Sequence, residues 1–102
     1  MKNLSSFLPT QALKKINKWL SRFDCKVIIT NPRQTKLGDY RSPNNNKNHI
    51  ISINNNLNKY SFLITLTHEI AHMMIWEKYK NNVKPHGSEW KEMFKKLMIN
   101  FM

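Results

Sequence analysis

The chain has 102 residues, the length of one domain, so we expect a single domain over residues 1–102. A single cysteine excludes an internal disulfide and a four-cysteine zinc site, and it suits a reducing compartment. Seventeen Lys and Arg against six Asp and Glu give a net charge of +11, which favours anionic partners such as nucleic acid. A lysine-rich composition that serves only solubility is the alternative. The N-terminal residues contain no long apolar stretch, so we expect a cytoplasmic protein without a membrane partner.

The first predicted element is a helix over residues 9 to 22. Pro9 suits its first turn, and apolar residues recur at helical spacing at Ala12, Leu13, Ile16, Trp19, Leu20 and Phe23. The opposite side is cationic, with Lys14, Lys15, Lys18 and Arg22. This side is either a solvated face or a stripe that contacts nucleic-acid phosphates.

Three short strands are predicted next. Residues 27 to 29 are β-branched and lie between turn-forming residues, which indicates a strand. Residues 34 to 41 and 48 to 53 are predicted to form a hairpin, because residues 42 to 47 between them are rich in turn formers. Gly38 indicates a bulge or a close backbone approach. His49 begins a strand beside a polar loop, and we expect it to be an ordinary residue and no metal ligand.

Two helices complete the chain. The first is predicted over residues 61 to 81, and its segment FLITLTHEIAHMMIW is apolar almost all round, as in a buried helix. Its polar residues Thr65, His68, Glu69 and His72 are expected to face a cleft. The last helix is predicted over residues 88 to 101. This order predicts an α+β, zincin-like domain with an N-terminal helix, a small three-stranded and mainly antiparallel sheet, an active-site helix and a C-terminal helix.

The run HEIAH at residues 68 to 72 matches the pattern H-E-x-x-H. Two histidines four residues apart share one helix face, so His68 and His72 can bind one zinc ion. Glu69 between them can accept a proton from a metal-bound water. The alternative is a helix with two incidental histidines, but burying these three side chains without partners would be costly. The motif therefore predicts a metal-dependent hydrolase, with a peptidase favoured.

A catalytic zinc usually has three protein ligands, so a third must come from elsewhere. The candidates downstream are His86, Glu89 and Glu92. His86 lies between Pro85 and Gly87, at a junction of loop and helix from which its side chain can be directed back at the preceding helix. Glu89 is the alternative ligand. Without the upstream motif, His86 would be interpreted as a surface loop residue.

The run HEIAH, followed after a short spacer by PHGSEWK, resembles the SprT-like zinc metalloproteases, relatives of the Spartan DNA–protein crosslink proteases. Residues 33–41, 49–54 and 62–66 are also similar to this family, and the downstream element H-G-x-x-W-K makes the likeness specific. The resemblance implies that His68, His72 and His86 bind one Zn²⁺ and that Glu69 is the catalytic carboxylate. Family members often carry a cysteine-rich zinc ribbon, which this sequence lacks.

We therefore expect a zinc-dependent metalloendopeptidase that cleaves DNA-associated or DNA-crosslinked proteins, with single-stranded or junction DNA as a further partner. One alternative is a zinc peptidase without a nucleic-acid role. Another is a nucleic-acid-binding module with a structural zinc. Glu69 argues against that module, because a structural site needs no carboxylate beside an open metal position.

Other residues carry weaker expectations. Tyr40, Tyr60 and Tyr79 are candidate oxyanion donors by chemistry alone. The strand around residues 35 to 41 is expected at or next to a sheet edge, where a peptide could add as an extra strand. Cys25 is expected to be a small buried apolar residue, because nothing near it in the sequence would activate a nucleophile.

Overall fold

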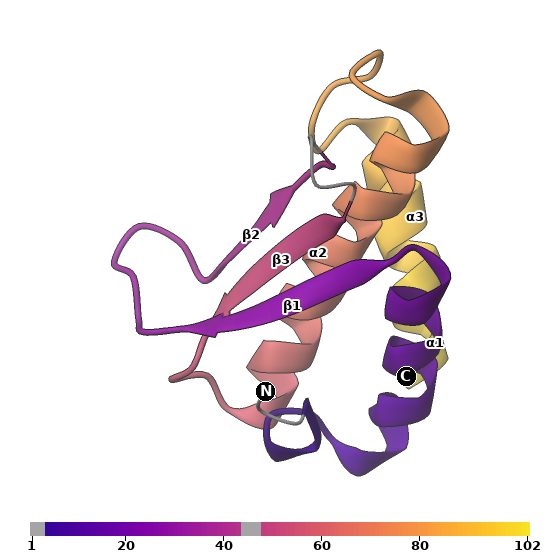
Figure 1. Ribbon diagram of the computed structural model, residues 1–102. Coiled ribbons are helices and arrows are strands. Elements are labelled where there is room, and N and C mark those ends of the chain that lie inside the picture. Colours follow the sequence, from indigo (N-terminus) through magenta and orange to yellow (C-terminus); the bar gives the residue numbers. More distant parts are fainter. Residues whose placement is uncertain (1–3, 44–47) are drawn as a thin grey trace.

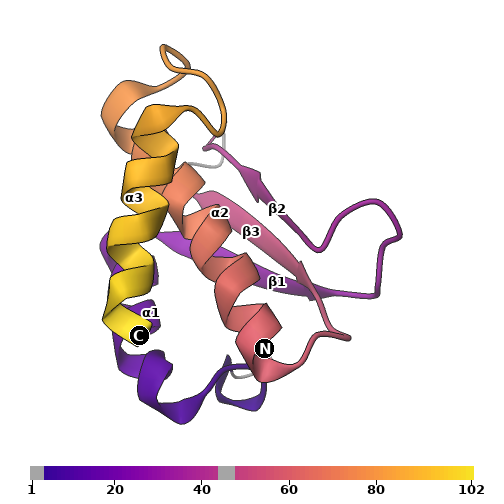
Figure 2. The ribbon, with the colours of Figure 1, turned by 180° about the vertical axis from the view of Figure 1, so that it is seen from behind.

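The computed structural model describes residues 4–43 and 48–102, and it confirms the expected α+β class. A 3₁₀ turn follows Pro9 and leads into α1 (Leu13–Arg22), so the N-terminal helix begins as 3₁₀ and becomes α-helical at Leu13. The later elements are β1 (Cys25–Thr30), β2 (Gly38–Arg41), β3 (His49–Asn54), α2 (Lys59–Tyr79) and α3 (Ser88–Met98). Figure 1 shows the three strands in front of α2, and Figure 2 shows α2 and α3 from behind. Within the described ranges, every helix is too short or too polar to cross a membrane.

The sheet has the order β1-β3-β2 and is mixed, whereas the sequence indicated mainly antiparallel pairing. The hairpin is confirmed, since β2 pairs antiparallel with β3, although residues 44–47 of its loop lie outside the described residues. β1 pairs parallel with β3, with Val27 opposite Ile51. This arrangement arises because the loop at 31–37 carries the chain past the end of β3, so that β1 and β2 lie on opposite sides of it.

The loop at 31–37 is held by the side chain of Asn54, which is 1% exposed. Its Nδ2 donates to the carbonyl oxygens of Arg33 (3.3 Å) and Lys36 (2.9 Å), and Arg33 Nε donates back to Asn54 Oδ1 (2.8 Å). Residues 34–37 therefore lie in a loop, and their prediction as part of a strand is wrong. Side-chain hydrogen bonds to the backbone replace the ladder that a strand would need.

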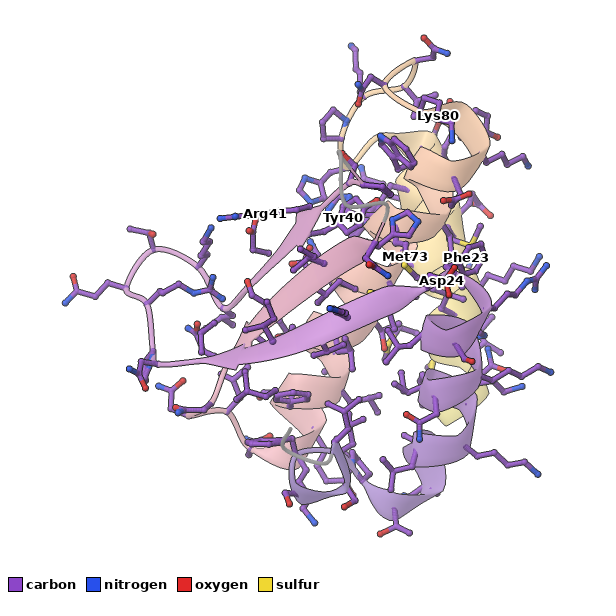
Figure 3. All side chains as sticks on the ribbon, in the orientation of Figure 1. Phe23, Asp24, Tyr40, Arg41, Met73 and Lys80 are labelled. Carbon is purple, nitrogen blue, oxygen red and sulfur yellow. The ribbon has the colours of Figure 1, made fainter. Side chains whose placement is uncertain are left out.

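The strand β2 is an edge of the sheet, as expected, and it lies very close to α2. A Cβ atom at Gly38 would come within 2.8 Å of Thr65 Cγ2 and 3.0 Å of Ile53 Cδ1. Glycine therefore allows the close backbone approach that the sequence suggested. Further along β2, Arg41 projects away from the sheet (Figure 3), and its side chain is 75% exposed.

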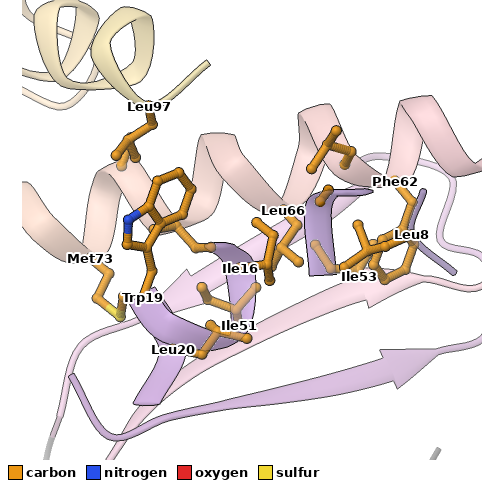
Figure 4. Close-up of a cluster of buried hydrophobic side chains, with 14 of the residues drawn as sticks. Leu8, Ile16, Trp19, Leu20, Ile51, Ile53, Phe62, Leu66, Met73 and Leu97 are labelled. Carbon is orange, nitrogen blue, oxygen red and sulfur yellow. The ribbon is translucent and has the colours of Figure 1, made fainter. Parts of the chain in front are cut away.

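The core lies between the inner face of the sheet and the helices (Figure 4). On β3, Ile51 and Ile53 are fully buried while Ser52 between them is partly exposed, as the two-residue period of a strand requires. The fully buried hydrophobic residues come from the N-terminal segment, α1, β3 and α2: Leu8, Ile16, Ile51, Ile53, Phe62, Leu66, Ile70, Ala71 and Met73. The nearly all-apolar sequence of α2 is thus explained by its central position, and Met73 on this helix is fully buried.

Candidate metal centre

The helix α2 brings His68, Glu69 and His72 to one side. Its start is fixed by Asn58, whose Oδ1 accepts a hydrogen bond from the Ser61 amide (2.8 Å). His68 and His72 lie one turn apart, with their ring centroids separated by 5.0 Å. The geometry of α2 alone therefore sets the spacing of these two imidazoles.

The third histidine comes from the loop between α2 and α3. His86 has a φ of 58°, a left-handed conformation that is uncommon for a residue other than glycine. Gly87 N donates to the carbonyl of Lys84 (3.1 Å), which closes a turn around His86, and the carbonyl of Gly87 accepts from Lys91 N at the start of α3. The turn directs the imidazole of His86 back onto α2.

The three imidazoles meet at their Nε2 atoms. His86 Nε2 lies 2.9 Å from His72 Nε2 and 3.2 Å from His68 Nε2, and the possible ligand atoms of the three residues all lie within 4.8 Å of one another. Nitrogens bound tetrahedrally to one zinc at about 2.0–2.1 Å would lie roughly 3.3 Å apart. The cluster thus has the right donor atoms, at suitable separations, to hold a single zinc ion.

The surroundings favour the neutral imidazole that a metal requires. Burial lowers the pKa of His72 to about 4, and the neighbouring His68 and His86 act in the same direction. Burial and His86 also lower the pKa of His68. Because a proton competes with a metal for the ring nitrogen, these shifts keep the nitrogens available at neutral pH.

The helix α3 supports the cluster through Trp90, which is 8% exposed. Its indole stacks against the ring of His72, with centroids 5.2 Å apart and an interplanar angle of 25°, and its Nε1 donates to the carbonyl oxygen of His68 (3.3 Å). The ring of Phe94 stacks on the indole of Trp90, with centroids 5.1 Å apart. The aromatic residues of α3 therefore fix the orientation of the imidazoles on α2.

Glu69 is 7% exposed and lies beside the histidines. Burial raises the pKa of its carboxyl to about 7, and Asp39 on β2 adds to this, while Lys36 and Arg33 oppose it. A carboxylate with this pKa can both accept and release a proton near neutral pH. Glu69 also lines a cavity of about 260 Å³ together with Gly38, Thr65 and His68.

The model of the SprT-like family matches residues 8–101, which include the whole of α2, His86 and α3. The chain belongs to the SprT-like family. This confirms the resemblance found in the sequence. No curated protein sequence matches the chain at a significant level.

The alternative ligands, Glu89 and Glu92, are not part of the histidine cluster. In the described part of the chain, the group of side chains that could hold a metal comprises His68, His72 and His86. Glu89 lies in the first turn of α3, where Ser88 Oγ donates to its carboxylate (3.4 Å), and it lines a different cavity together with Glu92.

The other residues singled out in the sequence lie on separate elements. Lys14, Lys18 and Arg22 are exposed on α1 and Lys15 is partly buried there. Tyr60 lies in the first turn of α2 and Tyr79 at its end, while the Tyr40 hydroxyl hydrogen-bonds to His49. Cys25 is partly buried, and burial raises the pKa of its thiol to about 12, which makes it a poor nucleophile, as expected.

One notable residue was missed. His49 was expected to be ordinary, but it is 1% exposed and its two ring nitrogens contact Tyr40 and Glu77. A signal was present in the sequence, because His49 alternates in phase with Ile51 and Ile53 and must point toward the same buried face. The partner Glu77, which lies 28 positions later, had no such signal.

Proposed function

We propose that this SprT-like chain is a zinc-dependent endopeptidase in which His68, His72 and His86 hold one zinc ion and Glu69 is the catalytic base. The observation that most supports this proposal is the convergence of three Nε2 atoms beside a buried carboxylate. A metal ion would bind the lone pairs of all three Nε2 atoms, which otherwise contact one another at 2.9 and 3.2 Å.

The chemistry of such a site divides between the ion and the protein. When bound, zinc supplies a Lewis acid that lowers the pKa of a coordinated water and polarises the peptide carbonyl. Glu69, buried beside the histidines, would accept the proton of the attacking water and pass it to the leaving amine. Trp90 and the turn at His86 keep the imidazoles oriented. A structural zinc site would not need the carboxylate, which is why we favour an enzyme over a binding module.

The edge strand β2 offers a place for a peptide substrate. It is unpaired on one side, and it runs along α2 from Gly38, which lies against Thr65, toward Arg41. A peptide that added to this edge would gain backbone hydrogen bonds independent of its sequence. Cavities on the two sides of the cluster, one lined by His68 and Glu69 and one by His72, could accept side chains near the cleaved bond.

We further propose that the substrates are DNA-associated or DNA-crosslinked proteins, located in the cytoplasm. The net charge of +11 and the exposed cationic residues of α1 support this proposal. If it holds, binding of single-stranded DNA should weaken steeply with salt, DNA should stimulate cleavage, and Lys14→Gln with Lys18→Gln should reduce the salt dependence. A peptidase without a nucleic-acid role would cleave free and DNA-bound protein at equal rates.

The peptidase proposal is tested by Glu69→Gln, with Glu89→Gln as the matched control. We expect Glu69→Gln to lower hydrolysis of an unstructured protein by roughly 10²–10⁴-fold while zinc content and fold persist. Glu89→Gln should behave like the unchanged chain. Full activity in Glu69→Gln, or loss of zinc in Glu89→Gln, would contradict the assignment of these residues.

A further inference from the structure

A buried chain of polar side chains links three elements next to the metal centre. His49 on β3 lies between Glu77 on α2, with Nε2 to Oε2 at 2.6 Å, and Tyr40 on β2, with Nδ1 to the hydroxyl at 2.7 Å. The side chain of His49 is 2% exposed, whereas that of Glu77 is 37% exposed. The proposed peptidase chemistry uses none of these three residues.

The hydrogens of this chain can be assigned from its chemistry. The carboxylate of Glu77 can only accept, so Nε2 of His49 must carry a proton. The other ring nitrogen, Nδ1, lies 2.7 Å from the Tyr40 hydroxyl, which can donate to it. Burial raises the pKa of Tyr40, with Cys25 and Glu77 adding to the effect, so the phenol keeps the proton that it donates. Each buried polar atom in the chain is therefore satisfied.

At its Tyr40 end, this series of hydrogen-bonded side chains reaches the wall of the cavity next to His72. Tyr40 and Trp76 both contact the ring of His49, with centroids 5.7 Å away in each case. The same two residues, together with His72 and Trp90, line a cavity of about 450 Å³. A shift of Tyr40 would thus change both the position of β2 and the shape of a cavity that includes a proposed metal ligand.

The strand β2 is held by its antiparallel pairing with β3 and by the close approach of Gly38 to Thr65 on α2, and Tyr40 adds a buried side-chain contact. The strand has four residues; Gly38 has no side chain, and Asp39 makes surface ion pairs with Lys36 and Arg41, which contribute little. Tyr40 faces inward from the middle of the strand, between Asp39 and the outward-pointing Arg41 (Figure 3). Among the side chains of β2, Tyr40 therefore makes the buried polar contact that links the strand through His49 to Glu77 on α2.

We propose that His49 and Glu77 are positioning residues, which hold Tyr40 and with it the edge strand β2 in place beside His72. This inference rests on the proposed function, because it assumes that a peptide substrate adds to β2 and fills the adjoining cavity. Its consequence is that weakening the buried chain impairs substrate binding more than it impairs the chemical step.

The test compares Tyr40→Phe and Glu77→Leu with the conservative variant Glu77→Gln, whose side-chain carbonyl can still accept from Nε2. Loss of one such hydrogen bond should raise KM about fivefold, with kcat and zinc content unchanged. Glu77→Gln should stay close to the unchanged chain. The double variant Tyr40→Phe/Glu77→Leu should be no worse than the worse single variant, because both act through His49.

Asn58→Ala is the control for a purely structural effect, since it removes the N-cap of α2 and should lower Tm while KM stays the same. Hydrogen exchange of the β2 amides gives a readout independent of activity. Exchange should accelerate in Tyr40→Phe and Glu77→Leu but not in Asn58→Ala. If all three variants only lowered Tm, leaving KM and β2 exchange unaltered, the positioning role would be overturned. Should the chain lack peptidase activity altogether, the proposed function fails, while the exchange data still decide whether His49 and Glu77 position β2.

Discussion

The four histidines of this chain fall into two environments that differ in what satisfies their ring nitrogens. His49 has a carboxylate on one nitrogen and a phenol hydroxyl on the other. His68, His72 and His86 instead direct their Nε2 atoms at one another, at 2.9 and 3.2 Å. Burial alone would not point to the metal site, because His49, whose two ring nitrogens both have protein partners, is the most buried of the four. The partners of the ring nitrogens distinguish a histidine that fits a metal site from one that stabilises a fold.

The backbone differs between the same two environments. His49 lies in a regular strand, with Ile51 and Ile53 in phase on the buried face. His86 adopts a φ of 58°, which is unfavourable for a residue with a Cβ. Such strain persists where the surrounding structure fixes it, and it is common at functional sites. The strained turn is consistent with a side chain placed for binding.

The largest effect expected from this comparison is stabilisation by zinc. At a concentration of free zinc about a thousand times its dissociation constant, the free energy of unfolding should rise by about 4 kcal/mol. For a domain of this size, Tm should then rise by roughly 15–30 °C. Thermal unfolding in the presence of chelator and of added zinc measures this shift. A Tm that did not respond to zinc would mean that the three imidazoles do not act as a metal site.

The next effect separates the two kinds of histidine directly. His86→Ala should weaken zinc binding by at least about a hundredfold, because even residues that only support a metal ligand often contribute 10–100-fold. His49→Gln should bind zinc as the unchanged chain does. Competition with a chelating dye measures both affinities. Equal losses in the two variants would remove the distinction between the two environments.

Much of the histidine cluster was predictable because its signal is local. The spacing of His68 and His72 on one helix face follows from the helical period, and Pro85 and Gly87 indicate the turn that carries His86. The hairpin of β2 and β3 was predictable for the same reason. The parallel pairing of β1 with β3 was not, because strand order depends on long-range packing. The contact between His49 and Glu77 was likewise inaccessible, since it joins residues 28 positions apart.

The smallest effect concerns pH in the metal-free protein, where Glu69 and His72 oppose each other. The pKa of Glu69 is raised from 4.5 to about 7, so its contribution to stability is present at low pH and is lost as the pH rises through 7. The pKa of His72 is lowered from 6.5 to about 4, so its contribution is present above 6.5 and is lost as the pH falls through 4.

Two variants separate these opposing terms. With chelator present, Glu69→Gln retains the His72 term and should lose stability when the pH falls from 7 to 4. His72→Gln retains the Glu69 term and should gain stability over the same change. Each effect should be on the order of 2 kcal/mol, after allowing for partial exposure. Urea unfolding at the two pH values gives the signs, and the same sign in both variants would show that these groups do not control the pH response.

The most direct test of the metal centre is zinc K-edge X-ray absorption on the zinc-loaded chain, together with the zinc content per chain. We predict one zinc per chain, with three imidazole nitrogens and one oxygen at about 2.0–2.1 Å. Replacement of His86 by alanine should reduce the imidazole count to two. An absence of stoichiometric zinc, a sulfur ligand from Cys25, or an unchanged spectrum after loss of His86 would contradict the proposed site.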